Sequence, residues 1–294
     1  MLLKKFSVKN FKNFDRENTL DFTNVKEYNF NDNCIKDNIL KNILIYGKNA
    51  VGKTNIGMAL FDITYHLVDK KKNNKLYVNY LNADSDEETA SFCYEFALED
   101  RIAVYRYLKD AQSQLIKEAL FIDEKLVFSM DYIKGEGDFD NLKVFGLDTL
   151  NWEFRDNGIS VLRYMANNLS LPKEHPIMKI MHFVNGMLWF SSKQGAETYI
   201  GFSSKAELVM DYIIRHDLVE EFEGFIRKYG VDEKIQATKN PDGTVSLYFK
   251  HKRLIPFCLA SNGIIALTLP EATQRELRQG HNLEKLYMSG EFDG

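Results

Sequence analysis

The sequence predicts an α/β fold, and three patterns in succession indicate it. A mostly apolar run at residues 39–46 predicts a buried strand, a glycine-rich loop follows it, and apolar residues then recur at helical spacing as far as residue 68. A strand, a loop and a helix in direct succession are typical of α/β proteins. We therefore expect one such unit near the N-terminus, followed by a β-rich insertion and a helical block.

The composition is that of a globular chain and excludes several classes of protein. The 294 residues are 45% hydrophobic and 27% charged, so the chain can bury a sizeable core. A net charge of −4 does not support DNA binding by the whole molecule, although a local basic patch stays open. Three widely spaced cysteines fit neither a zinc knuckle nor a disulfide framework. No apolar run has the length of a membrane span and no apolar leader is present, so we expect a cytoplasmic protein without a membrane partner.

The first predicted elements are two short strands and a helix. Residues 2–22 contain two alternations of apolar and polar residues, and the polar stretch at 15–18 between them predicts a turn. After the apolar run at 39–46, a helix is predicted over residues 54–68. Its apolar face consists of Ile56, Leu60, Ile63 and Leu67.

The middle of the chain predicts antiparallel hairpins and then helices. Residues 91–129 alternate and are rich in aromatic and β-branched side chains, whereas residues 160–230 have helical periodicity. Residues 120–124 read LFIDE, which has the hydrophobic-Asp-Glu form of a Walker B motif. Because a strand pattern resumes at once, Asp123 and Glu124 are predicted to form a hairpin turn, and Glu124 as a catalytic carboxylate is the alternative. A strand is predicted again at residues 245–251.

The strongest functional signal is the glycine-rich loop. Residues 47–54 read GKNAVGKT and match G-x-x-x-x-G-K-[ST] in full. Glycines let backbone N–H groups turn toward phosphate oxygens, and the following helix presents its N-terminus to the same anion. Lys53 is expected to reach the β- and γ-phosphates, and the Thr54 hydroxyl is expected to ligate Mg²⁺. The sequence thus predicts a P-loop site for ATP and Mg²⁺, formed by Gly47, Lys48, Asn49, Ala50, Val51, Gly52, Lys53, Thr54 and Asn55.

Four segments resemble the RecF/OLD/SMC-like branch of the ABC ATPase class. GKNAVGKTN, which ends at Asn55, resembles the Walker A motif of that branch, and KFSVKNFKNFDRENTLDF is similar to its opening hairpin. The tail PEATQRELRQGHNLEKLYMSGEFDG resembles the end of bacterial, defence-associated AAA-type members. IPFCLASNGIIALTL resembles the segment with the signature motif. Its residues Ser261, Asn262 and Gly263 match the turn that contacts, in trans, the ATP of a second subunit.

The resemblance implies a P-loop NTPase fold: a single ABC-type head over residues 1–294, with a mixed or antiparallel β subdomain and a helical subdomain. The implied parts are an N-terminal hairpin and P-loop unit (1–69), an antiparallel β insertion (76–150), a helical subdomain (158–230), and a signature-like segment with the tail (231–294). The resemblance also implies an ATP-driven, nucleotide-dependent homodimer. Its implied role is bacterial anti-phage defence, with a separately encoded nuclease or toxin as effector.

One part of the family pattern is missing from the sequence. The family has an apolar strand ending in Asp-Glu after the signature helix, and a switch histidine later, but here Leu269 leads directly into Pro270 and the tail. Two functions therefore stay open: an ATPase, or a hydrolysis-deficient nucleotide-binding regulator or scaffold. A small-molecule kinase is disfavoured, because the insertion offers no clear arginine-bearing lid. The missing strand would also leave residues 39–46 with an unpaired edge, so we expect low stability or unusual association.

Overall fold

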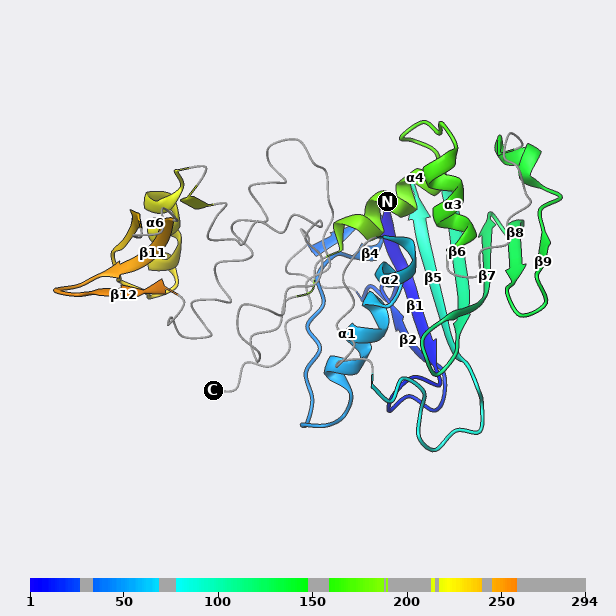
Figure 1. Cartoon of the computed structure of the whole chain (residues 1–294), viewed down its shortest axis with the longest axis horizontal. Coiled ribbons are helices and arrows are strands. Elements are labelled where there is room, and N and C mark those ends of the chain that lie inside the picture. Colours follow the sequence, from blue (N-terminus) through cyan, green and yellow to red (C-terminus); the bar gives the residue numbers. More distant parts are fainter. Residues whose placement is uncertain are drawn as a thin grey trace. The chain divides into compact units, whose positions relative to one another are not determined.

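The computed structural model of the chain describes residues 1–26, 34–68, 78–147, 159–187, 189, 213–214, 217–239 and 245–257 (Figure 1). These residues belong to two compact units, one within Met1–Met187 and the other within Leu188–Leu283. The division falls inside the expected helical subdomain, residues 158–230. The signature-like residues Ser261, Asn262 and Gly263 lie outside the described residues.

A seven-stranded antiparallel sheet with the order β2-β1-β5-β6-β7-β8-β9 forms the centre of the first unit. The expected N-terminal hairpin and the hairpins of residues 91–129 are confirmed. Strand β1 pairs with β5 from Leu2↔Ala97 to Lys9↔Ser91, so the N-terminal hairpin and the β insertion share one sheet. The strands are β1 (Leu2–Lys9), β2 (Asn18–Asp21), β5 (Ala90–Leu98), β6 (Arg101–Lys109), β7 (Leu115–Ile122), β8 (Lys125–Asp131) and β9 (Glu136–Asp138).

The prediction of a buried strand over residues 39–46 is wrong. Only β4 (Ile39–Leu40) is extended into a ladder, and it pairs with β3 (Ile35–Lys36). Leu44 is 79% exposed and Tyr46 is 87% exposed. Every strand pair within the described part of the chain is antiparallel, so this segment has no parallel neighbour there. A strand needs such a neighbour for its backbone N–H and C=O groups, and an apolar pattern alone does not supply one.

The helix expected over residues 54–68 is two helices, α1 (Lys53–Phe61) and α2 (Thr64–Leu67), separated at Asp62 and Ile63. The Thr64 hydroxyl donates to the Phe61 carbonyl at 2.7 Å and so satisfies one of the carbonyls left at the end of α1. All four residues of the expected apolar face are buried. The remaining helices of this unit are the 3-10 helix η3 (Leu142–Phe145), α3 (Val161–Asn168) and α4 (Pro176–Gly186).

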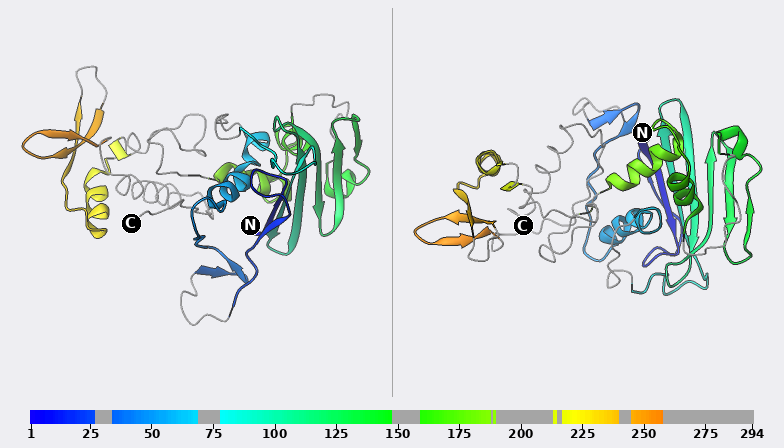
Figure 2. Two further views of the ribbon diagram at one scale, coloured as in Figure 1. Left: turned by 90° about the horizontal axis from the view of Figure 1, so that it is seen from below. Right: turned by 45° about the horizontal axis from the view of Figure 1, so that its top comes forward.

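The helices α1 to α4 cover one face of the large sheet (Figure 2). Alternate residues of β5, among them Phe92, Tyr94 and Phe96, are buried on that face. Phe96 meets Phe183 of α4 edge to face, with ring centroids 5.4 Å apart. The period-2 pattern therefore makes one face of the sheet an aromatic surface on which the helices pack.

The second unit is a smaller α/β element. Helix α6 (Val219–Lys228) packs on a three-stranded antiparallel sheet of β10 (Ile235–Lys239), β11 (Val245–Lys250) and β12 (Leu254–Pro256). The core between them contains Phe222, Ile226, Leu247, Phe249 and Phe257. The strand expected at residues 245–251 is confirmed.

A buried carboxylate joins α3 to the large sheet. Glu118 Oε2 accepts hydrogen bonds from Tyr105 Oη at 2.6 Å and from Ser160 Oγ at 2.8 Å. Glu118 Oε1 accepts from Tyr132 Oη and from the backbone N–H of Val161. Because Ser160 and Val161 begin α3, this carboxylate lies at the positive end of the helix dipole.

Candidate functional site

The glycine-rich loop leads directly into α1, as expected. Residues 47–51 are exposed, and α1 begins at Lys53. The Thr54 side chain is also exposed and lies in the first turn of the helix. The loop is therefore accessible to a ligand at the point where the first N–H groups of a helix lack intrahelical partners.

Two residues of this loop have a left-handed backbone conformation. Gly52 caps α1 with φ 100° and ψ 11°, and Ala50 has φ 65°. Left-handed residues within a turn direct neighbouring N–H groups to the same side, which makes a concave site for an anion. Gly52 has no side chain, and α1 has no side-chain cap at this end.

The Lys53 ammonium group contacts the backbone at the start of the loop. Its Nζ donates to the carbonyl oxygens of Gly47 and Lys48, both at 2.9 Å. These contacts hold a positive charge beside the turn of backbone N–H groups. A phosphate group would be attracted to the same ammonium, which would exchange carbonyl oxygens for phosphate oxygens.

Asn13, in the connection between β1 and β2, makes hydrogen bonds that hold the loop. Its Nδ2 donates to the Val51 carbonyl at 3.4 Å, and its Oδ1 accepts from Asn55 Nδ2 at 2.7 Å. A Cβ atom on Gly52 would lie 2.3 Å from Asn13 Nδ2, so this glycine is needed for space as well as for its φ. Sequence reasoning missed Asn13, because 38 positions separate it from Val51 and no motif marks it.

The structure places Glu124 on a hairpin turn. Asp123 has φ 50° and Glu124 has φ 64°, and the two residues connect β7 to β8. The Asp123 carboxylate accepts from the Ile102 backbone N–H at 2.9 Å, which is a structural use of that side chain. The expected turn is confirmed. The Glu124 side chain lies in this turn and is exposed.

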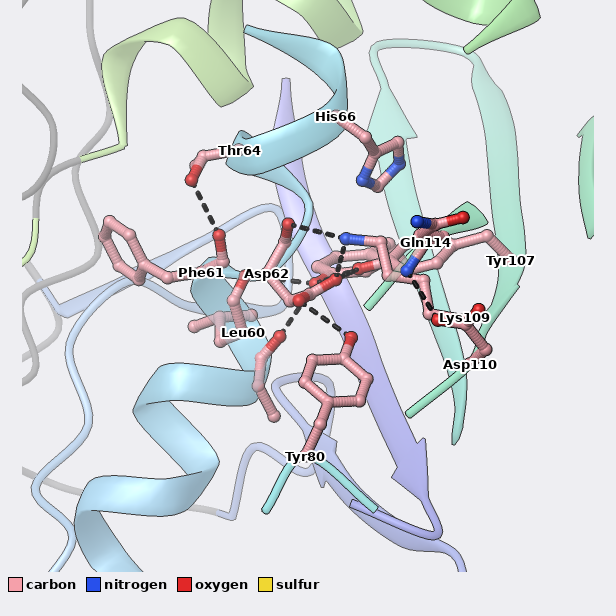
Figure 3. A network of polar contacts seen from close by, with 12 residues as sticks. Leu60, Phe61, Asp62, Thr64, His66, Tyr80, Tyr107, Lys109, Asp110 and Gln114 are labelled. Atoms are coloured by element: carbon pink, nitrogen blue, oxygen red, sulfur yellow. Dashed lines mark hydrogen bonds and ion pairs between the residues drawn. The ribbon is translucent and has the colours of Figure 1, made fainter. Parts of the chain in front are cut away.

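At the other end of α1, a buried ion pair joins this helix to the sheet (Figure 3). Asp62 Oδ2 lies 2.5 Å from Lys109 Nζ, and the two side chains are 0% and 2% exposed. Tyr80 Oη donates to Asp62 Oδ1 at 2.8 Å, and Tyr107 Oη donates to Oδ2 at 3.0 Å. Sequence reasoning missed this cluster, since its members come from three separate segments of the chain.

Burial lowers the pKa of Lys109, a member of this ion pair, and of the neighbouring His66. Loss of solvent lowers the pKa of Lys109, and the Asp62 carboxylate opposes that shift. The pKa of His66 lies well below its ordinary value, first because the ring is buried and second because the Lys109 charge is near. His66 Nε2 is 3.0 Å from Tyr105 Oη, which links the ring to the Glu118 cluster.

No protein-family model and no curated protein matches this chain. Within the described ranges, none of the helices combines the length and the apolar character that crossing a membrane requires. The same residues contain no group of three or more His, Cys, Asp or Glu side chains placed to hold a metal ion. A cation at the loop would therefore depend on the exposed Thr54 hydroxyl and on oxygens that a ligand brings.

We predict that Gly52→Ala lowers the free energy of unfolding by about 1–2 kcal/mol, because an L-residue is strained in the left-handed region. The contact with Asn13 adds to that cost. Urea denaturation of the two proteins measures the difference. Gly47→Ala is the control in the same loop, since a Cβ there would meet only Val51 Cγ2 at 3.4 Å. Equal losses for both variants would contradict the assigned conformation.

We predict that His66 makes stability fall as the pH drops below about 6.5, the ordinary pKa of histidine. The folded protein keeps the ring neutral while the unfolded chain binds a proton, so stability is lost with a slope of up to about 1.4 kcal/mol per pH unit. Urea denaturation from pH 7.5 to 5.5 should show a smaller slope for His66→Gln. His182→Gln, which changes an exposed histidine of α4, should keep the wild-type slope. The same slope in all three proteins would rule out this role.

Proposed function

We propose that this chain binds ATP with Mg²⁺ at residues 47–55 and acts as a nucleotide-dependent switch. The observation that supports the proposal is the left-handed Gly52 at the start of α1, together with the Lys53 ammonium at the mouth of the same loop. Backbone donors, a helix N-terminus and one cation are the groups that recognise a polyphosphate.

Each residue of the loop has a separate role in this proposal. The glycines permit the turn, the backbone N–H groups of residues 48–53 donate to phosphate oxygens, and Lys53 supplies positive charge. Thr54 supplies a hydroxyl ligand to Mg²⁺, whose other ligands are phosphate oxygens and water. Asn13 and Asn55 keep the loop in place and need not touch the nucleotide.

The resemblance to RecF/OLD/SMC-like ATPases extends the proposal to a dimer. In it, Ser261, Asn262 and Gly263 of one copy would meet the γ-phosphate held by the loop of a second copy. The same resemblance suggests a cytoplasmic role in anti-phage defence, with a nuclease or toxin on another chain as effector.

A second candidate function is binding without hydrolysis. Phosphoryl transfer to water needs a group that orients the water and cations that stabilise the developing charge. Asp123 and Glu124 occupy a hairpin turn in which Asp123 bonds to the backbone of β6. This geometry favours a nucleotide-binding regulator over an ATPase that uses Glu124.

We predict that Lys53→Ala weakens binding of ATP with Mg²⁺ by roughly 10- to 100-fold, which corresponds to one lost hydrogen bond to a charged group. Isothermal titration calorimetry measures the dissociation constant. Lys48→Ala is the matched control, because it removes a lysine of the same loop but keeps the backbone N–H. The absence of any binding heat for folded wild-type protein would refute the proposed function.

Steady-state phosphate release separates the two candidate functions. For the non-hydrolysing regulator we expect no turnover above that of Lys53→Ala, even when ATP saturates the site. Analytical ultracentrifugation with and without ATP and Mg²⁺ then tests the nucleotide-dependent dimer. Turnover that Glu124→Gln abolishes would instead assign the catalytic role to Glu124 and would exclude the second candidate.

A further inference from the structure

We propose that the buried Asp62–Lys109 pair positions the phosphate-binding loop. The pair fixes the C-terminal end of α1 on the sheet, and the N-terminal end of that same helix carries Lys53 and Thr54. Asp62 and Lys109 are thus positioning residues that act through α1 and touch no ligand. The effect on nucleotide affinity depends on the proposed function, whereas the effect on the loop does not.

Side chains from the sheet hold the terminal carbonyl groups of α1. Tyr94 Oη donates to the carbonyl oxygens of Ala59 and Leu60 at 3.1 and 3.0 Å. Lys109 Nζ lies 3.4 Å from the Asp62 carbonyl oxygen, so a cation stands at the negative end of the helix dipole. Because both donors come from the sheet, α1 is attached to strands β5 and β6 at its C-terminal end.

The Asp62 carboxylate is held in one arrangement by its hydrogen bonds. It accepts hydrogen bonds from Tyr80, Tyr107 and Lys109 in a fully buried position. A buried charge without these donors would cost much free energy, so rotation or sliding of α1 that breaks the contacts is strongly opposed. The ion pair therefore fixes the orientation of the helix as well as its attachment.

A second chain of contacts leads from Asp62 to the loop without passing along α1. The ring of Tyr80, which donates to Asp62, meets the Phe11 ring edge to face at a centroid distance of 5.1 Å. The Tyr80 carbonyl oxygen accepts from the Lys12 backbone N–H at 3.0 Å. The next residue, Asn13, is the one that contacts Val51 and Asn55. Asp62 is thus connected to both sides of the loop, through α1 and through the β1–β2 connection.

The two ends of α1 are close enough for a rigid helix to transmit a shift from one end to the other. Helix α1 has 9 residues, which at about 1.5 Å per residue gives a length of roughly 13 Å. A tilt at its C-terminal end would displace Lys53 at the other end. Loss of the ion pair should therefore loosen the loop more than a general loss of stability would.

The Glu118 cluster provides a matched control for a merely structural role. Glu118 is also a buried carboxylate with four hydrogen-bond donors, but the helix it holds is α3. Asp62→Asn and Glu118→Gln make the same chemical change in the two clusters. Each variant removes a buried negative charge and keeps the size of the side chain.

The test compares two amides by hydrogen exchange in the full chain without nucleotide. The Ile56 N–H donates to the Gly52 carbonyl at 2.9 Å and reports on the junction of loop and helix, and the Tyr164 N–H donates to the Ser160 carbonyl at 2.9 Å and reports on α3. We expect Asp62→Asn to speed exchange at Ile56 relative to Tyr164 by roughly 3- to 30-fold, and Glu118→Gln to have the reverse effect. Equal changes at both amides in Asp62→Asn would overturn the proposal.

Calorimetry with ATP and Mg²⁺ adds a readout that separates this inference from the proposed function. We expect binding to Asp62→Asn to be roughly 3- to 30-fold weaker, with Glu118→Gln close to wild type. Wild-type protein that gives no heat would refute the proposed function, and the exchange comparison would still decide the inference. If the wild-type protein binds ATP and Asp62→Asn binds it with the same affinity, the inference is overturned and the proposed function is not. If Asp62→Asn does not fold, Tyr80→Phe and Tyr132→Phe make the same comparison with one tyrosine hydroxyl removed from each cluster; the Tyr132 hydroxyl also bonds to the backbone of Ile159 and Val161.

Discussion

The structure of the first unit depends on the hydrogen bonding of two buried carboxylates. Asp62 and Glu118 lie under the helices on the aromatic face of the sheet, where an unpaired charge would be costly. Tyrosines from the strands donate to both carboxylates. Asp62 in addition pairs with the Lys109 ammonium group, which fixes α1, and Glu118 accepts from the backbone N–H of Val161 at the N-terminus of α3, which fixes that helix. The aromatic residues thus do two things, since their rings fill the core and their hydroxyl groups satisfy the charges.

This arrangement gives each helix a defined position on a sheet whose inner face is largely apolar. Apolar contact alone has no direction, so it would let α1 and α3 slide along the aromatic surface. Hydrogen bonds to a carboxylate have direction, and they specify one position for each helix. His66 Nε2 bonds to Tyr105 of the Glu118 cluster, and the His66 ring packs edge to face against Tyr107 of the Asp62 cluster.

Local patterns in the sequence predicted the parts of the structure that are determined locally. The alternation in β5 to β8, the turn at Asp123 and Glu124, and the start of α1 after the glycine-rich loop depend on residues close in sequence. The interruption at Asp62 was not predictable, because the side chains that hold Asp62 come from residues 80, 107 and 109. Asn13 was missed for the same reason. Residues 39–46 show the converse. Their apolar pattern is typical of a buried strand, but a strand also needs a hydrogen-bonded neighbour from elsewhere in the chain.

The same distinction separates the two proposed functions. Binding of a polyphosphate needs one continuous loop and one helix N-terminus, and a short stretch of sequence specifies both. Hydrolysis needs in addition a group that orients the attacking water, and such a group comes from another segment of the chain, which is a non-local requirement. In the described part of the chain, the segment 42–46 has exposed side chains at Leu44 and Tyr46 in place of a neighbouring strand. Nucleotide binding is therefore the part of the proposal that the geometry of α1 and its loop supports, whereas hydrolysis would require a water-orienting group from another segment of the chain.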